Sequence, residues 1–345
     1  MIFFNSTADP RYYTPKMSKV SSPTEASNLT IVQPAGFYLV GLTNVKSSEY
    51  LLVFLFLVYV ITILGNFILM AVVYLHPQLH TPRYMTVFNL AVVDVLQSTV
   101  LIPKTLQAFL FNSNYIGFNA CFTQCFFAHY AGSVISYSIV LMAYDRFVAI
   151  CFPLRYPSIN TNARMFIIIA SCWILLIIPL LYMVLSALKL SFCATVEIPI
   201  FYCGFGPLVR LGCGDKTEQL RVVQILTIGG LHCPLLFIAL TYVAILVTVL
   251  KLDTAESRRK AISTCATHLI LVLLFYMPKI VTYMMAQLSV TYFHAIQNIT
   301  VVLSHTIPLM FNPVIYCLKT EEVRTLIFRS FKKRISPIVL TRVQK

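Results

Sequence analysis

The sequence predicts an all-α membrane protein, a seven-transmembrane helix bundle with its N-terminus outside and its C-terminus in the cytoplasm. Only 11% of the 345 residues are charged, and the mean hydropathy is +0.80. Soluble domains carry roughly a quarter charged residues, so this chain lacks the charge to cover a water-facing surface. Lipid accepts an apolar exterior and disfavours charge, which accounts for the composition.

Seven stretches are long enough to cross a bilayer, which takes ~20 apolar residues at 1.5 Å per residue. They are Tyr50–Tyr74, Tyr84–Ala108, Phe118–Tyr144, Met165–Leu188, Val222–Leu250, Ala261–Leu288 and Tyr292–Leu318. Their apolar runs are continuous, which favours helices over a barrel with alternating residues. We therefore expect an extracellular tail (1–48), a seven-transmembrane domain (49–318) and a cytoplasmic tail (319–345) with a short amphipathic helix.

The basic residues predict the orientation, because Lys and Arg concentrate in cytoplasmic loops. With the N-terminus outside, most of them fall on the cytoplasmic side: Arg83, Arg146, Arg155, Arg164, Lys251, Arg258, Arg259, Lys260, Lys319, Arg324, Arg329, Lys332, Lys333, Arg334, Arg342 and Lys345. The net charge of +14 is therefore a topology signal and a surface for lipid or a partner protein. We do not expect nucleic-acid binding.

The N-terminal stretch carries two acceptor motifs for glycosylation, at Asn5 and Asn28. A third match, at Asn298, lies in the seventh span and is expected to stay unmodified. Residues 1–16 lack the sustained apolar core of a secretory signal, so the first span should act as the insertion signal. Met1 and Met17 both stay open as the start.

Residues inside the spans carry a family resemblance. Gly65-Asn66, Asp94, MAYDRFVAIC (142–151), Trp173 and NPVIY (312–316) follow one another in an order that resembles rhodopsin-like G-protein-coupled receptors. PKTLQ (103–107), FFAHY (126–130), KAISTCATHL (260–269) and FYMP (275–278) resemble the odorant receptors of that family. The DRF triplet and the outer-loop sequence are more similar to fish receptors.

The resemblance implies a receptor that binds a small-molecule odorant from outside and activates a heterotrimeric G protein. The expected G protein is the olfactory stimulatory type, which raises cyclic AMP. The chain would be a multi-pass plasma-membrane protein in the cilia of olfactory neurons, and neither an enzyme nor a holder of a metal or cofactor.

Four cysteines fall on the oxidising side of the membrane. The resemblance implies a disulfide between Cys121 and Cys203, and we also predict one between Cys193 and Cys213.

Two groups of residues are candidates for the activation machinery. The resemblance implies a role in G-protein coupling or switching for Asp145, Arg146, Tyr242, Asn312, Pro313 and Tyr316. Read alone, Arg146 has a second interpretation as an arginine that snorkels to the interface, which is the less favoured of the two. Asp94 should face the bundle interior with Asn66 or Asn312 as partner, and both a cation site and a plain polar link stay open. Ile135 stands where the family often has Glu, which argues against the cation.

The resemblance places the ligand among residues of the third, sixth and seventh spans: His129, Ser133, Tyr276, Lys279, Tyr283 and His305. A lysine in an apolar helix costs a few kcal/mol, so Lys279 needs a partner or a wet cavity. We expect it to pair with an acidic ligand. The alternative is a structural lysine that snorkels outward or bonds Tyr283 or Gln287. His129 is equally a hydrogen-bonding core residue, and Phe275 is expected to pack rather than to recognise ligand.

Other classes of membrane protein fit less well. Transporters often show internal repeats, and none is found here. A membrane enzyme would need paired acids or metal-ligand spacing, whereas Asp94 is the only carboxylate inside a span. A non-olfactory receptor of the same class would differ only in ligand response or tissue.

Overall fold

A computed structural model describes residues 34–42, 48–111, 113–193, 195–287 and 294–329. Within this part, seven helical segments are long and apolar enough to cross a membrane. They are built from α1 (Ser48–Leu75), α2 (Pro82–Phe111), α3 (Phe118–Cys151), α5 (Asn162–Leu188), α7 (Thr217–Thr227) continued by η4 (Ile228–His232) and α8 (Cys233–Leu250), α9 (Ala255–Gln287) and α10 (His294–Lys319).

Several helices run further than the apolar stretches that predict them. The third extends beyond Tyr144 to Cys151, and the fifth begins at Thr217 rather than Val222. Hydropathy marks only the part of a helix that lies in hydrocarbon, and hydrogen bonding continues the helix into polar residues at each end. As a result Asp145 and Arg146 are helical residues, about one and a half turns before the end of α3 at Cys151.

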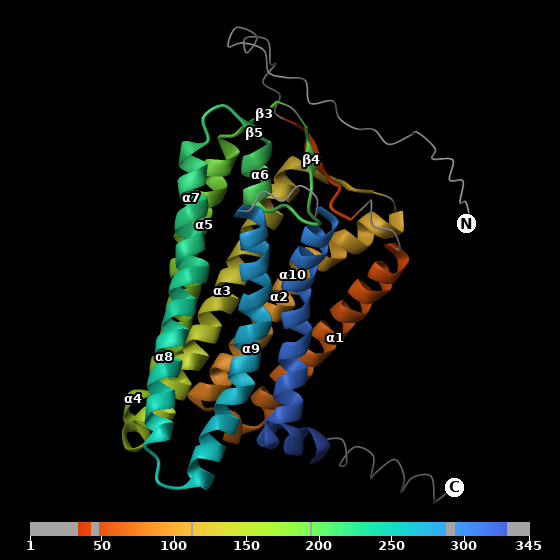
Figure 1. The fold of residues 1–345 in the computed structure, drawn as a ribbon. Coiled ribbons are helices and arrows are strands. Elements are labelled where there is room, and N and C mark those ends of the chain that lie inside the picture. The colour runs from red at the N-terminus through yellow and green to blue at the C-terminus, as the bar shows by residue number, and fades with distance from the viewer. Residues whose placement is uncertain (1–33, 43–47, 112, 194, 288–293, 330–345) are drawn as a thin grey trace, which may run out of the picture.

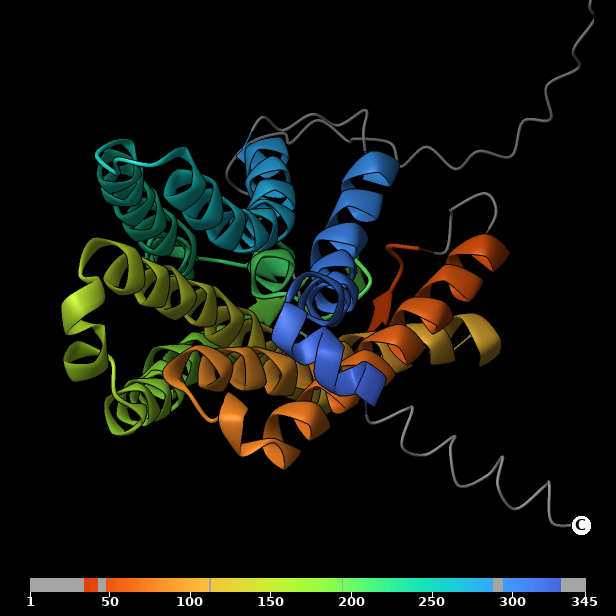
Figure 2. The same cartoon turned by 90° about the horizontal axis from the view of Figure 1, so that it is seen from below.

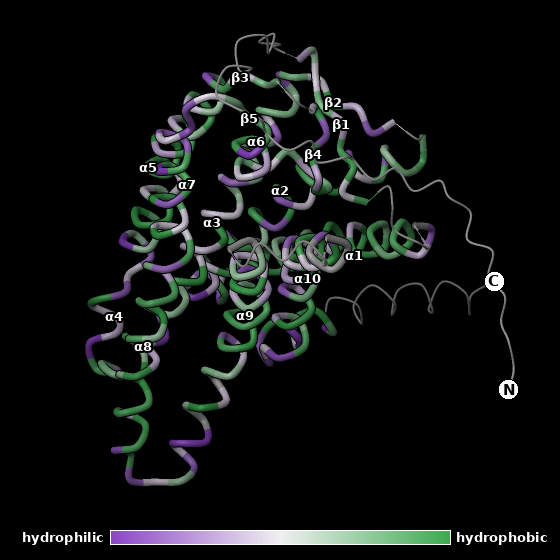
Figure 3. Tube along the Cα trace, turned by 45° about the horizontal axis from the view of Figure 1, so that its top comes forward, coloured by the Kyte–Doolittle hydropathy of each residue, from purple (hydrophilic) through white to green (hydrophobic). Residues whose placement is uncertain are grey.

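The helices form one bundle with α3 at its centre (Figures 1 and 2). α3 packs against α2, α5, α8 and α9, while α1 packs against α2 and α10. Figure 3 shows hydrophobic residues along the helices and hydrophilic residues gathered at the connections. α5 shows how little of some helices is buried by protein, since Leu175 and Ile178 are mostly exposed. Such faces fit a lipid surrounding.

Prolines interrupt the helical hydrogen bonding at several depths, and one of them explains the hydrogen bonds that Asn66 makes. Pro313 has no N–H to give to the carbonyl of Leu309 one turn earlier in α10. The side-chain amide of Asn66 on α1 donates to that carbonyl at 3.4 Å, and to the Thr62 carbonyl at 2.9 Å. A Cβ on Gly65 would meet Pro313 at 3.0 Å, so glycine lets the two helices approach.

Two small sheets and a short helix close what we call the upper end, at the top of Figure 1. β1 (Gly36–Leu39) lies between β2 (Tyr115–Gly117), which is antiparallel to it, and β4 (Glu197–Ile198), which is parallel. β3 (Ser191–Phe192) pairs antiparallel with β5 (Gly212–Cys213), which follows α6 (Phe205–Leu211) in the sequence. Phe37 of β1 is fully buried against Phe118, Phe122 and Phe192. β1 is thus packed into the upper end.

The opposite, lower end carries η2 (Pro77–Leu79), η3 (Pro153–Arg155), α4 (Tyr156–Ile159) and a further helix at 321–329. This last helix buries Val323 and Leu326 while its Arg324 is exposed, so it is amphipathic.

Candidate functional site

The upper half of the bundle encloses a cavity of about 370 Å³, within the usual range for small-molecule sites. Its walls come from α3, α7, η4, α9 and α10, and from the connection between α5 and α7 that contains Tyr202 and α6. The lining residues are Ala128, His129, Gly132, Ser133, Tyr202, Gly206, Leu226, Thr227, Gly230, Leu231, Phe275, Lys279, Thr282, Tyr283, Ser304 and His305. Five of the six residues expected to contact ligand therefore line one cavity.

The sixth, Tyr276, lies beneath the cavity rather than on its wall. It is 1% exposed, and its hydroxyl lies 2.7 Å from the Ser136 hydroxyl on α3. Ser136 also donates to the carbonyl of Gly230 at 2.8 Å, and Tyr137 donates to the carbonyl of Gly229 at 3.0 Å. Both carbonyls belong to η4, a π-helical turn. Tyr276 thus links α9, through α3, to the wider turn in the fifth spanning segment.

Lys279 is the cationic group of the cavity. Its ammonium lies 4.5 Å from the centre of the Phe275 ring, a cation–π distance. None of the described residues forms an ion pair with it, and no hydrogen bond joins it to Tyr283; the side chain of Gln287 lies outside the described residues. Phe275, which the sequence suggested as packing only, both lines the cavity and supports the lysine.

His305 ties the cavity to the loop above it. Its Nδ1 bonds to the Val301 carbonyl at 2.9 Å, and its Nε2 lies 3.3 Å from the Tyr202 hydroxyl. Burial, and to a lesser extent the nearby Cys125, raises the pKa of the Tyr202 phenol, so the phenol stays protonated and donates to Nε2. Tyr202 precedes Cys203, which is bonded to Cys121 at the top of α3. The loop is therefore fixed on both α3 and α10.

The disulfides lie at the upper end, and both pairs expected from the sequence are joined there. Cys121 and Cys203 have Cα atoms 5.4 Å apart, and Cys193 and Cys213 have Cα atoms 6.1 Å apart. The Cys203 amide also donates to the Gln124 side chain at 3.0 Å, so the connection between α5 and α7 is bound to α3 by this hydrogen bond as well as by the disulfide. Asn5 and Asn28 lie outside the described residues. Asn298 lies within α10 and donates to the Gly41 carbonyl at 2.8 Å.

Asp94 lies fully buried in the middle of the bundle. Asn312 donates to its Oδ2 at 2.8 Å, so Asn312 is its partner, whereas Asn66 bonds backbone carbonyls instead. Among the described residues, Oδ1 of Asp94 and the side-chain oxygen of Asn66 have no hydrogen-bond partner. The pair joins α2 to α10 at the level of the Pro313 interruption.

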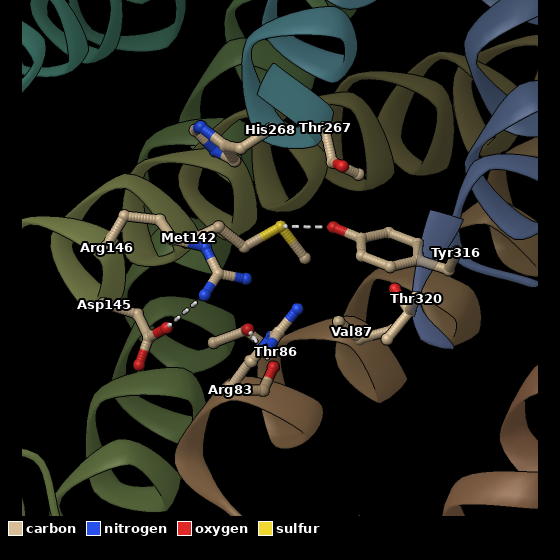
Figure 4. Close-up of a pocket in the computed structure, with 10 residues that line it drawn as sticks. All are labelled: Arg83, Thr86, Val87, Met142, Asp145, Arg146, Thr267, His268, Tyr316 and Thr320. Atoms are coloured by element: carbon tan, nitrogen blue, oxygen red, sulfur yellow. Dashed lines mark hydrogen bonds and ion pairs between the residues drawn. The ribbon is translucent and has the colours of Figure 1, made fainter. Parts of the chain in front are cut away.

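At the lower end of α3, Arg146 is held close to its neighbour. Its guanidinium lies 3.7 Å from Oδ2 of Asp145, and their side chains are only 12% and 3% exposed (Figure 4). Oδ1 of Asp145 accepts hydrogen bonds of 2.7 Å from Tyr156 and from Asn160. Burial and the Asp145 carboxylate raise the pKa of the Tyr156 phenol, which keeps it a donor. The acid is thus fixed from α4 while it holds the arginine.

The space around Arg146 is almost closed, with a volume of about 10 Å³, room for roughly one water. Tyr316 of α10 forms one wall and donates to the sulfur of Met142 at 3.2 Å (Figure 4). Tyr242 of α8 does not reach Arg146 but bonds His268 of α9 at 2.8 Å. Of the residues expected to act in coupling, Asp145, Arg146 and Tyr316 line this closed site, whereas Tyr242, Asn312 and Pro313 do not. A protein partner cannot reach Arg146 without helix movement.

Beside this closed site lies an open groove of about 510 Å³, lined from η2, α2, α9 and the helix at 321–329. Tyr84 at its edge donates to the carboxylate of Glu322, and Arg83 lies 5.3 Å from the Tyr84 ring centre. These contacts hold the last helix across the lower end of the bundle.

Some of these residues carried no role in the sequence analysis. His268 was quoted there only as part of a family string. Tyr156, Asn160 and Tyr202 lie in connections whose course a single sequence does not define, and Glu322 lies on the helix at 321–329, whose contact with α2 the sequence does not predict.

Comparisons with known proteins agree with this geometry. The sequence pattern of one family, described as Olfactory receptor, matches residues 55–334. Olfactory receptor 8H1 of Homo sapiens is 37% identical over 299 residues, which span 86% of this chain and 95% of that protein. Olfactory receptor 1A1 of Homo sapiens is 35% identical over 87% and 96%. Squid rhodopsin, 21% identical, superposes with a TM-score of 0.67 over 86% of this chain and 88% of its own.

Proposed function

Because the chain belongs to the olfactory receptor family, whose members sense odorants and signal through G proteins rather than catalyse reactions, we propose its ligand class and its coupling. The ligand is a small acid that binds in the upper cavity, and the G protein is the stimulatory type that raises cyclic AMP. The receptor is a multi-pass protein of the plasma membrane. Its place in sensory cilia is part of the proposal.

The proposed orientation puts the upper end outside the cell. Two disulfides at that end support it, because disulfides persist in oxidising surroundings. The lower end carries Arg83, Arg155, Arg164 and Lys251, as the cytoplasmic side of a membrane protein should. The upper cavity then faces odorants, and Arg146 faces the G protein.

Lys279 carries the proposal of an acidic ligand. It is an ammonium group in a cavity whose lining contains neither Asp nor Glu. A charge that is buried without an opposite charge is unfavourable, and a ligand carboxylate would supply that charge. The Phe275 ring offers only the weaker cation–π contact. A neutral odorant would leave the lysine without an ionic partner.

The test compares matched acids and methyl esters of moderate size, such as straight-chain and steroidal carboxylic acids, with cyclic AMP as the readout. On the wild-type receptor the acids should be more potent than their esters. Lys279→Met should weaken the acids tenfold to a hundredfold, since a charge-assisted hydrogen bond contributes ~1.5–3 kcal/mol. Equal potency of acid and ester on the wild type, or full acid potency on the variant, would mean that Lys279 is structural.

Coupling is proposed to work by opening the closed site at the lower end. A ligand shifts a conformational balance only if it binds the two forms with different affinity. The closed form is the one with Arg146 held by Asp145 and Tyr242 held by His268. The open form exposes Arg146 to the G protein, so ligand and G protein should each strengthen the binding of the other.

A further inference from the structure

His129 has one ring nitrogen engaged and one free. Its Nδ1 lies 2.9 Å from the backbone carbonyl of Cys125, one turn earlier in α3. A carbonyl oxygen only accepts, so Nδ1 must carry the hydrogen. In the neutral ring this leaves a lone pair on Nε2, which makes Nε2 an acceptor. No described residue forms a hydrogen bond with that nitrogen.

The electrostatics of the cavity favour the neutral ring. Lys279 lines the same cavity and already brings one positive charge, and no acidic residue is among the lining side chains. The apolar residues Leu226, Leu231 and Phe275 lower the local dielectric, in which two like charges repel strongly. His129 therefore offers an acceptor rather than a second cation.

His305, the other histidine of the cavity, has no free nitrogen. The Val301 carbonyl accepts from its Nδ1, and the Tyr202 hydroxyl donates to its Nε2. Tyr202 keeps that hydrogen because burial raises the pKa of its phenol. Of the two rings that line the cavity, only the one on α3 retains an acceptor nitrogen without a hydrogen bond from a described residue.

We propose that His129 is a specificity-determining residue that accepts a hydrogen bond from a hydroxyl or N–H group of the ligand. Lys279 on α9 is a donor, and His129 on α3 is an acceptor in the same cavity. The preferred ligand is then an acid that also carries a hydrogen-bond donor, such as a hydroxy acid. This inference rests on the proposed function, in which the cavity binds ligand and Lys279 meets its acid group.

Ser133 is the competing explanation for any preference for a donor. It lies one helical turn after His129, lines the same cavity, and its hydroxyl can accept as well as donate. A hydroxyl also donates, so Ser133 would tolerate a ligand ether oxygen. The lone pair on Nε2 of His129 would not tolerate an ether oxygen, because both atoms are acceptors. The difference between a ligand hydroxyl and its methyl ether therefore separates the two residues.

The experiment uses straight-chain ω-hydroxy acids from hexanoic to dodecanoic, the corresponding ω-methoxy acids and the methyl esters of the hydroxy acids. Potency is measured as cyclic AMP, and binding as the thermal stability of purified full-length receptor. On the wild type the best hydroxy acid should exceed its methoxy partner about threefold to tenfold, the range for one neutral hydrogen bond. A wild-type ratio of one across the whole series overturns the inference.

Two substitutions at His129 and one control then assign the preference. His129→Phe keeps a ring but removes the acceptor, so the hydroxy-to-methoxy ratio should fall to about one. His129→Gln keeps an acceptor oxygen and should retain part of the ratio, and Ser133→Ala should leave it unchanged. If Ser133→Ala removes the ratio and His129→Phe does not, the assignment to His129 is wrong.

The same series separates this inference from the proposed function beneath it. Lys279→Met should abolish the advantage of the hydroxy acids over their methyl esters and preserve the hydroxy-to-methoxy ratio. If wild type shows no preference for acid over ester, yet a hydroxyl preference that depends on His129, the acidic ligand is wrong and the acceptor site stands.

Discussion

Tyr242 and His268 are hydrogen-bonded to each other at 2.8 Å, and their rings are stacked with centres 5.8 Å apart. The Nε2 of His268 lies 3.0 Å from the Ile139 carbonyl of α3, so Nε2 is the donor and Nδ1 accepts from Tyr242. Three helices, α3, α8 and α9, are joined by this one buried histidine. The Tyr242 hydroxyl is thereby held at His268 rather than at Arg146.

Replacing this histidine should favour the open form. His268→Phe keeps the ring and removes both hydrogen bonds, so the closed form loses about 1–2 kcal/mol and its balance with the open form shifts about tenfold. We expect a rise in ligand-independent cyclic AMP at equal surface expression. Leu269→Ile, at the neighbouring lipid-facing position, is the matched control. Basal signalling equal to that of the control would show that this contact does not hold the receptor closed.

Arg146 should be required for coupling and not for folding. Arg146→Ala removes an ion pair at 3.7 Å, but the buried Asp145 carboxylate keeps its hydrogen bonds from Tyr156 and Asn160, so the fold should be retained. The variant should reach the cell surface and lose the cyclic AMP response to ligand. Arg155→Ala, an exposed arginine nearby, should keep it. A full response from Arg146→Ala would remove this residue from the coupling machinery.

Asp94 and Asn312 should be interchangeable as a pair. Asn312→Leu leaves a fully buried carboxylate without its donor at 2.8 Å, which should cost a few kcal/mol and lower surface expression and thermal stability. The exchanged double variant, Asp94→Asn with Asn312→Asp, recreates the contact and should recover much of the loss. The wild type, the two single variants and the double variant form a double-mutant cycle, which is measured as the thermal stability of purified receptor. If the stability change of the double variant equals the sum of the changes in the two single variants, the two residues are not coupled.

The two disulfides should contribute unequally to stability. Cys121–Cys203 closes 82 residues and Cys193–Cys213 closes 20, and the entropy of loop closure alone favours the longer link by about 1 kcal/mol. Cys121→Ser with Cys203→Ser should therefore lower the melting temperature more than Cys193→Ser with Cys213→Ser. Peptide mapping without reduction checks both pairs in surface receptor, and free thiols at Cys121 and Cys203 would contradict the first.

The sequence predicts the seven helices well because hydropathy follows directly from the cost of placing polar groups in lipid. It places Lys279 in an apolar helix for the same reason, and the structure has that lysine on the cavity wall. The helix ends are less accurate. α3 continues through Asp145 and Arg146 because backbone hydrogen bonds, not side-chain hydropathy, decide where a helix stops.

The hydrogen-bond partner of a residue is harder to predict from the sequence than the helix on which the residue lies. Asn66 and Asn312 looked equivalent as partners of Asp94, and the choice depended on Pro313, which leaves the Leu309 carbonyl for Asn66 to satisfy. Tyr276 was expected to contact ligand, and the sequence did not indicate that its hydroxyl would lie against Ser136, off the cavity wall. Tyr202 lies on a connecting loop, and no periodic pattern indicates which helix such a loop will contact.

β1 has a consequence for the order in which the chain can fold during synthesis. Tyr38 and Leu39 are made before any spanning helix, but they pair with Glu197 and Ile198, which follow the fourth one. Gly41 accepts from Asn298, which belongs to the last. Chain segments emerge from the ribosome in sequence, so the buried face of Phe37 must wait for most of the protein. A receptor arrested before β3 would lack Phe192 and would still expose that aromatic segment, a surface that chaperones bind.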